Sequence, residues 1–184
     1  MTMAPEFAAL RDDPFALLRA MDTRLRATHA DLAARGTAVW TGIAVRLGER
    51  WVVVPRAEVR EILPRPALTR VPGAKAFLLG IANLRGALLP VSDLGFLSGG
   101  KPAGIDRDQR IVVLNSRHIP AGFLVDAVGG YQRFSPEDQR HGLAGETGLP
   151  TPWLLGAFVH EARIWPVLSL QRVARSEEFT HAGA

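Results

Sequence analysis

The spacing of apolar residues in this chain changes near Gly36. Before that glycine, apolar residues recur at steps of three and four between residues 15 and 32, and Asp13-Pro14 is a typical helix start. From 39 to 47 apolar and mixed positions alternate, which is the period of a strand with one buried face. The pattern predicts an N-terminal helical extension over 1–37, followed by a β domain.

Short apolar runs bounded by glycine and proline predict the strands of that domain. They lie at 39–47, 51–54, 111–114, 121–128, 153–159 and 164–168, and 77–94 reads as two strands around a turn at 83–86. The segment 59–63 fits a strand or a helix, and Gly129-Gly130 predicts a break. The glycine-rich stretch 95–110 is expected to be a flexible linker or loop, 135–152 to be rich in turns, and 169–179 to be a short terminal helix.

Two of these strand–turn–strand segments resemble each other. Residues 77–94 and 153–170 align without a gap at an offset of 76, with six identities that include Gly80/Gly156 and Pro90/Pro166. A repeat of this kind predicts two related units, and hence two similar small barrels in tandem. The turns differ, with Asn-Leu-Arg-Gly at 83–86 and His-Glu-Ala-Arg at 160–163. A function carried by a turn would therefore belong to one copy.

Composition narrows the class of protein. With 47% hydrophobic and 22% charged residues the chain is ordinary for a globular domain, and the absence of cysteine excludes disulfides and thiolate metal sites. The longest stretch without Asp, Glu, Lys or Arg is 147–160, too short to span a bilayer. The first residues include neither a basic nor an apolar signal region, so we expect a cytoplasmic protein. The net charge of +4 arises within 38–100, where a mild positive surface could meet an acidic partner.

Catalytic motifs do not stand out. There is no G-x-S-x-G turn, Gly99-Gly100-Lys101 is followed by Pro102 instead of Ser or Thr, and the histidines never recur at helical ligand spacing. We therefore expect no enzyme activity, no metal and no cofactor. Arg85 is more suggestive, because a guanidinium held in a tight turn can pair with a carboxylate, from Glu61 or from a partner. An ordinary exposed hairpin arginine is the alternative.

One joined motif resembles a known family. The segments Val71-Pro72-Gly73, then FLLGIANLRG at 77–86 and LPVSDL at 89–94, are similar to the signature of the CheW-like adaptors of bacterial chemosensory systems. The upstream VREIL at 59–63 resembles that family's V-x-E-I segment. The N-terminal PFALL at 14–18 and Trp40-x-Gly42-Ile43 are most similar to the branch of the family that serves twitching motility by type IV pili.

The resemblance implies a mainly β fold of two tandem five-stranded SH3-like barrels over 38–177, sharing a core, with short helices before and after and a tail at 178–184. It also implies a non-catalytic scaffold that couples methyl-accepting chemoreceptors to the regulatory domain of a CheA-type histidine kinase, at the membrane-associated receptor array. By motif, the residues expected at or beside the receptor-facing surface are Val59, Glu61 and Arg85, where Glu61 and Arg85 could pair to fix the turn. Those expected near the kinase contact are Gly80, Asn83 and Gly86.

Two other functions are compatible with the sequence. A small-barrel protein that binds single-stranded nucleic acid would use the basic residues of 38–100 together with Trp40 and Trp51. The charge surplus is small, however, and both tryptophans lie in runs typical of a core. A hydrolytic site in the loop 135–152 would use Glu137, Asp138 or His141.

Overall fold

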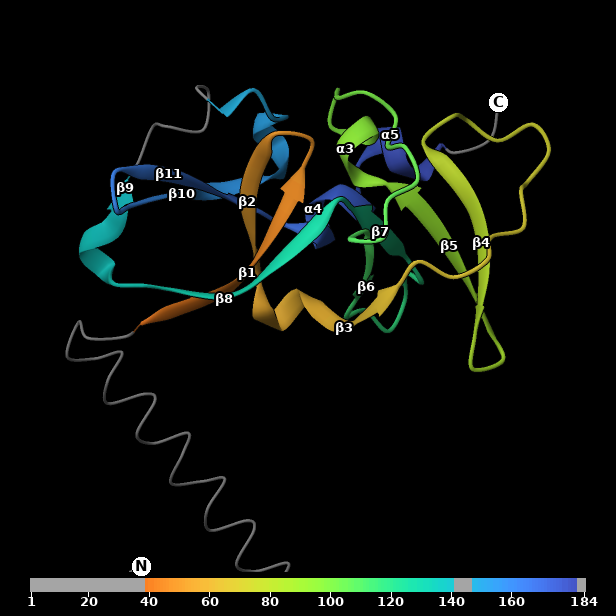
Figure 1. Cartoon of the computed structure of the whole chain (residues 1–184), viewed down its shortest axis with the longest axis horizontal. Helices are drawn as coiled ribbons and strands as arrows, with labels where there is room; N and C mark the ends of the chain where they lie inside the picture. The colour runs from red at the N-terminus through yellow and green to blue at the C-terminus, as the bar shows by residue number, and fades with distance from the viewer. Residues whose placement is uncertain (1–38, 141–146, 182–184) are drawn as a thin grey trace, which may run out of the picture. The chain divides into compact units, whose positions relative to one another are not determined.

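The computed structural model describes residues 39–140 and 147–181 and is mainly β (Figure 1). The helix expected within 1–37 lies outside the described residues. From Thr41 onward the described residues belong to one compact unit, which is built from two sheets and a few short helices.

The first sheet, called barrel 1 from here on, has strand order β8-β1-β2-β11-β10-β9. Its strands are β1 (Trp40–Leu47), β2 (Arg50–Pro55), β8 (Ala127–Phe134), β9 (Gln139–Arg140), β10 (Leu154–His160) and β11 (Arg163–Leu168). Phe134 of β8 stacks on Phe158 of β10 with ring centroids 4.5 Å apart, although these strands lie near opposite edges of the sheet. The sheet is therefore strongly curled. Five strands were expected, and the two-residue β9 is the addition.

The second sheet, barrel 2, has strand order β3-β6-β7-β5-β4. It consists of β3 (Val59–Pro64), β4 (Leu78–Leu84), β5 (Ala87–Asp93), β6 (Arg110–Leu114) and β7 (Gly122–Val125). A single bridge between Thr69 and Ile81 adds the segment after β3 to the outer edge of β4. Barrel 2 is thus contiguous in sequence, whereas barrel 1 combines strands from both ends of the domain.

The predicted repeat is confirmed in the backbone pairing. Gly80 of β4 pairs with Val91 of β5, and Gly156 of β10 pairs with Val167 of β11, each after a register shift. Both glycines have positive φ, at 145° and 152°. In each barrel the second strand of this hairpin then continues into a parallel pairing, β5 with β7 and β11 with β2.

Equivalent caps follow the two hairpins. The Asp93 carboxylate accepts a hydrogen bond from Phe96 N at the start of α3 (Leu94–Leu97). Ser169, at the matching repeat position, accepts one from Arg172 N at the start of α4 (Leu170–Ala174). Side-chain oxygens at such positions satisfy amides that the helix leaves free. The repeat therefore extends beyond the strands.

A shared hydrophobic core joins the barrels. Residues of β1 and β2 pack with residues of β6, β7 and α4 in one buried cluster, which includes Val45, Val52, Phe123 and Leu170. A smaller cluster, with Val91 and Ile111 among its members, fills barrel 2 alone. Glu58, in the 3₁₀ turn η1 (Arg56–Glu58), ties the start of barrel 2 to α4, because its carboxylate accepts hydrogen bonds from Ser169 Oγ (2.8 Å) and Gln171 N (3.1 Å).

Several local predictions need correction. Gly129-Gly130 lies inside β8 and is not a break; a Cβ on Gly129 would meet the Trp51 ring at 2.7 Å, so the glycine provides room for that ring. The terminal helix is two helices, α4 and α5 (Glu177–Thr180), because Ser176 starts the second with its own cap. Segment 59–63 is a strand, which extends to Pro64 at the sheet edge where a missing N–H is tolerated.

The two loops are only partly irregular. Segment 95–110 begins within α3, and the buried carboxylate of Asp93 accepts a hydrogen bond from Ala103 N at 2.7 Å. The turn-rich segment 135–152 includes η2 (Pro136–Asp138), β9 and the start of η4 (Thr151–Trp153). Its residues 141–146 lie outside the described residues.

Candidate functional site

The site begins at the turn between β4 and β5. Leu84 pairs with Ala87, so the turn proper is the two residues Arg85 and Gly86, with φ of 52° and 85°. Positive φ at both positions is the geometry that two-residue hairpins favour. The Asn83 side-chain oxygen accepts a hydrogen bond from Gly86 N at 2.9 Å and fixes this shape. The predicted tight turn is confirmed.

Arg85 pairs with Glu61 across the open edge of barrel 2. The Arg85 Nη2 to Glu61 Oε2 distance is 2.9 Å, although β3 and β4 occupy opposite edges of the sheet. The other oxygen, Glu61 Oε1, lies 3.5 Å from Arg60 Nε. Glu61 is 20% exposed, whereas Arg85 is 76% exposed. The remaining guanidinium donors of Arg85 are therefore accessible to a partner's carboxylate.

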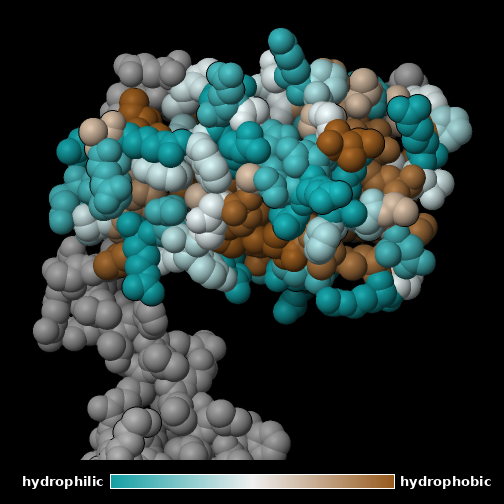
Figure 2. Space-filling view, in the orientation of Figure 1, coloured by the Kyte–Doolittle hydropathy of each residue, from teal (hydrophilic) through white to brown (hydrophobic). Residues whose placement is uncertain are grey.

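Aliphatic side chains surround this ion pair. Leu84 and Ala87 line the same shallow hollow as Glu61 and Arg85, and a neighbouring hollow of about 210 Å³ is lined mainly by Leu63, Pro64, Pro66, Ala82, Leu84 and Leu89. Leu88 is 68% exposed beside them. Figure 2 shows that this face of the molecule has a hydrophobic band flanked by hydrophilic residues. Charge beside apolar surface suits contact with another protein.

The other residues singled out from the motif have structural roles in the fold. Val59 is 3% exposed and belongs to the shared core, so it lies beneath the surface. A Cβ on Gly80 would lie 2.5 Å from the Thr69 carbonyl oxygen, so the close approach there is within this chain. A Cβ on Gly86 would have no atom within 4 Å, and the φ of this residue alone favours glycine. Glu61, Arg85, Asn83 and Gly86 come together; Val59 and Gly80 do not join them at the surface.

Asp138, one of the residues considered for a hydrolytic site, serves a cap instead. The Asp138 carboxylate accepts hydrogen bonds from Ser135 N (2.8 Å) and Ser135 Oγ (3.0 Å), and His160 Nδ1 lies 3.4 Å away. The backbone hydrogen bond from Ser135 lowers the pKa of Asp138 below its ordinary 3.8, which suits a permanent carboxylate better than an acid catalyst. His141 lies outside the described residues. Within 39–140 and 147–181, no three His, Asp or Glu side chains gather to hold a metal.

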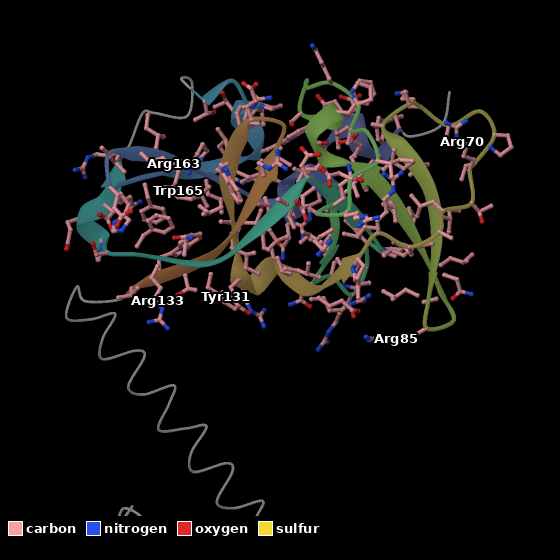
Figure 3. All side chains as sticks on the ribbon, viewed as in Figure 1. Arg70, Arg85, Tyr131, Arg133, Arg163 and Trp165 are labelled. Carbon is pink, nitrogen blue, oxygen red and sulfur yellow. The ribbon has the colours of Figure 1, made fainter. Side chains whose placement is uncertain are left out.

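Sequence reasoning missed an aromatic cluster in barrel 1. The Arg163 guanidinium carbon lies 4.5 Å from the centre of the Trp165 ring and 5.8 Å from that of Trp51 (Figure 3). Arg163 and Trp165 are two residues apart at the start of a strand, so their side chains lie on one face of the sheet. This spacing could have predicted that the two side chains are neighbours. Trp51, considered for base stacking, packs over Gly129 and Arg163.

The sequence matches a known family over most of its length. The family model of the CheW-like domain matches residues 41–178, three quarters of the chain. The chain belongs to the CheW-like family. This CheW-like protein is 37% identical to PilI of Pseudomonas aeruginosa over 169 residues, covering 90% of this chain and 94% of PilI. It is 32% identical to the chemotaxis protein CheW of Rhizobium meliloti over 136 residues, 74% of this chain and 88% of that one.

A solved structure agrees with the fold of this CheW-like protein. The scaffolding protein TtCheW from Thermoanaerobacter tengcongensis superposes with a TM-score of 0.67 at 23% identity, over 76% of this chain and 94% of that one. The expected architecture of two SH3-like barrels is confirmed. Among the described helices of the CheW-like protein, none is long and apolar enough to cross a membrane.

Proposed function

We propose that this protein is a non-catalytic adaptor that couples methyl-accepting chemoreceptors to a CheA-type histidine kinase, in the chemosensory pathway that controls twitching by type IV pili. The observation that carries the proposal is the exposed Arg85 guanidinium, held by Glu61 at the end of barrel 2 within the residues that match the CheW-like family model. The similarity to PilI supports the twitching pathway. The adaptor would work in the cytoplasm, at the receptor array.

In this proposal Glu61 and Arg85 face the receptor, and Val59 supports them from the core. Gly80, Asn83 and Gly86 shape the hairpin near the kinase contact. The buried position of Gly80 favours an indirect role, through the path of β4, over a direct contact. Asn83 and Gly86 are exposed and could contribute backbone and side-chain contacts themselves.

The test is Arg85→Glu, with Arg70→Glu as the matched control. Both arginines are exposed, so each substitution makes the same change of charge, and Arg70 lies at another part of barrel 2 (Figure 3). An exposed ion pair contributes about 0–1 kcal/mol, so Arg85→Glu is expected to fold. It should lose receptor control of kinase autophosphorylation in a reconstituted array, while Arg70→Glu keeps it. Normal activation by Arg85→Glu would remove the assignment.

A charge swap separates two roles for Arg85. If the ion pair only fixes the turn, the double variant Glu61→Arg/Arg85→Glu restores the pair with reversed polarity and should recover most of the coupling. If Arg85 also binds a carboxylate of the receptor, the double variant stays inactive although it folds. The available donors of Arg85 lead us to expect the second result.

A further inference from the structure

A small polar hollow lies where the loop between β6 and β7 meets the end of α4. Its volume is about 220 Å³. The lining comes from residues 114–119 of barrel 2 and from two side chains at α4, Gln171 and Arg175. Because α4 packs in the shared core, the hollow spans the join between barrel 2 and that core (Figure 1).

The charged side chains of this lining are all basic. Arg117, His118 and Arg175 contribute to it, and among the described residues no Asp or Glu does. Both arginines are exposed, and within the described part of the chain neither guanidinium makes a hydrogen bond or an ion pair. Glu177 and Glu178 follow Arg175 in α5 but form no ion pair with it. Two guanidinium groups are therefore available to an anion.

Ser116 adds a neutral donor to the same hollow. Its Oγ accepts hydrogen bonds from His118 N at 3.2 Å and from Ile119 N at 3.1 Å. Both lone pairs of the hydroxyl are thus in use, and its proton remains to be donated. The side-chain amide of Gln171 has no hydrogen-bond partner among the described residues and supplies two further N–H groups.

The two walls of the hollow are held in place by the protein itself. Asn115 N donates to the Glu58 carbonyl oxygen at 2.8 Å, and Asn115 Nδ2 donates to the Ala57 carbonyl oxygen at 2.9 Å. On the side of α4, Gln171 N donates to the Glu58 carboxylate. Both walls are therefore fixed to the same turn, η1. A site that is ordered in advance loses less conformational entropy when a ligand binds.

The donors suit a phosphate group better than a carboxylate. A phosphate monoester has a charge of about −1.5 to −2 at neutral pH and three strong acceptor oxygens. A guanidinium pairs with two such oxygens at once through its planar fork. Two arginines, one histidine and the Ser116 hydroxyl offer more charge and more donors than the two oxygens of a carboxylate can use.

The surroundings favour a small ligand over a protein. The centre of a protein interface is usually built from exposed apolar or aromatic side chains. The large apolar side chains that are exposed in the described residues lie elsewhere. The two apolar residues of the lining are Leu114, which is buried, and Ile119, which is half-buried. The hollow therefore offers polar recognition with little apolar area for a protein to cover.

We propose that the hollow between the β6–β7 loop and α4 binds a small phosphate-bearing anion, either inorganic phosphate or a soluble phosphate monoester. Arg117 holds the phosphate from the loop and Arg175 holds it from α4, while the Ser116 hydroxyl donates a further hydrogen bond. Glu61 and Arg85 do not line this hollow, so the inference does not depend on the proposed adaptor function.

The experiment is a calorimetric titration of the full chain with inorganic phosphate, and separately with adenosine 5′-monophosphate, at constant ionic strength. We expect saturable binding that Arg117→Gln and Arg175→Gln each weaken about tenfold or more, because each substitution removes hydrogen bonds to a charged group. Arg70→Gln removes an equal charge at an exposed position outside the hollow and should bind like the unaltered chain. Acetate, which has a single charge and two oxygens, should bind about tenfold more weakly than phosphate.

The side-chain amide of Gln171 gives a second readout that needs no substitution. In an NMR titration with inorganic phosphate, its signals should shift and saturate together with the heat of binding. The side-chain amide of Gln109 is the control, because it is buried outside the hollow and donates to the Gly104 carbonyl oxygen at 2.7 Å. Its signals should stay in place. This readout keeps the inference testable if an arginine variant proves unstable.

The outcomes distinguish the sources of the phosphate and decide on the site. Tighter binding of adenosine 5′-monophosphate than of inorganic phosphate, weakened in both arginine variants, supports the site with a monoester as its ligand; the reverse order supports it with the free ion. Gln171 signals that do not move at about 10 mM phosphate, or binding that both variants retain in full, would overturn the site. Acetate that binds as tightly as phosphate would overturn the choice of a phosphate group.

Discussion

The hairpin β4–β5 of barrel 2 and the hairpin β10–β11 of barrel 1 share a register but present opposite chemistry at their tips. The first turn has Arg85 and Gly86, with the arginine paired to Glu61; the second has Glu161, 86% exposed, and Ala162 at a φ of 58°. Behind the tips, aliphatic side chains fill barrel 2, whereas in barrel 1 the ring of Phe134 packs against those of Phe158 and Trp165.

This difference separates the features that both hairpins need for folding from the features that are free to differ between them. The positive-φ glycine, the shifted register and the capping residue after the hairpin are repeated because strand pairing and helix capping need them. The tip charges are not repeated, because no backbone requirement fixes them. A duplicated scaffold can thus present a basic tip on one hairpin and an acidic tip on the other.

The largest expected effect is a loss of stability on substitution of Gly80, which we compare with the matching glycine of the other hairpin, Gly156. Gly80→Ala should destabilise the protein by about 3 kcal/mol, since it combines strain at positive φ with a Cβ 2.5 Å from Thr69 O. Gly156→Ala should cost only about 1 kcal/mol, because nothing lies within 4 Å of its Cβ. Urea unfolding of both variants measures the difference. Equal losses would show that the clash with Thr69 relaxes without cost.

Smaller changes in stability are expected from substitutions in the two turns, and their signs should be opposite. Gly86→Ala should destabilise by about 1 kcal/mol, because alanine disfavours a φ of 85°. Ala162→Gly should stabilise by about 0.5 kcal/mol, since relief of the strained φ exceeds the added entropy of the unfolded chain. Thermal and urea melts of the pair check both signs. A loss of stability in Ala162→Gly would mean that the alanine methyl group makes a contact worth more than the strain.

The smallest expected effect is a change in the stability of barrel 1 at low pH, through the carboxylate of Asp138. Because the pKa of Asp138 is lowered in the folded protein, its carboxylate contributes stability above its ordinary pKa of 3.8, and this contribution is lost as the pH falls through the lower folded value. A carbon NMR titration of the Asp138 carboxyl should give a midpoint below 3.8. Asp138→Asn should remove this part of the acid sensitivity, and a midpoint at or above the ordinary value would refute the assigned hydrogen bonds.

Much of the fold could be predicted from the sequence, since strand period, glycine and proline boundaries and the offset repeat are local signals. Gly129-Gly130 was misread because its role depends on Trp51, which is distant in sequence and approaches only in the folded barrel. The split of the terminal helix was missed although Ser176 is a capping residue, because propensity alone does not end a helix at one residue.

The site was partly predictable. Arg85 and Glu61 could be named from the motif. Their ion pair forms because the sheet curls and brings its two edge strands, β3 and β4, together, and the sequence alone does not give the order of the strands in the sheet. The buried positions of Val59 and Gly80 could not be foreseen, because packing against Thr69 and the shared core is a tertiary property. Arg163 and Trp165 carried a signal in their alternate spacing, but Trp51 reaches them only across the parallel pairing of β2 and β11.

The interleaving of the barrels has a consequence for the order in which they can form. Barrel 2 uses a continuous stretch from β3 to β7, whereas β2 of barrel 1 must wait for Val167 of β11 to emerge before it pairs with Val53. During synthesis from the N-terminus, barrel 2 can therefore close on the ribosome first, while β2, which pairs with β1 on one side, still lacks β11 on the other. The domain can thus form from its middle outward, with the sheet of barrel 1 completed after that of barrel 2.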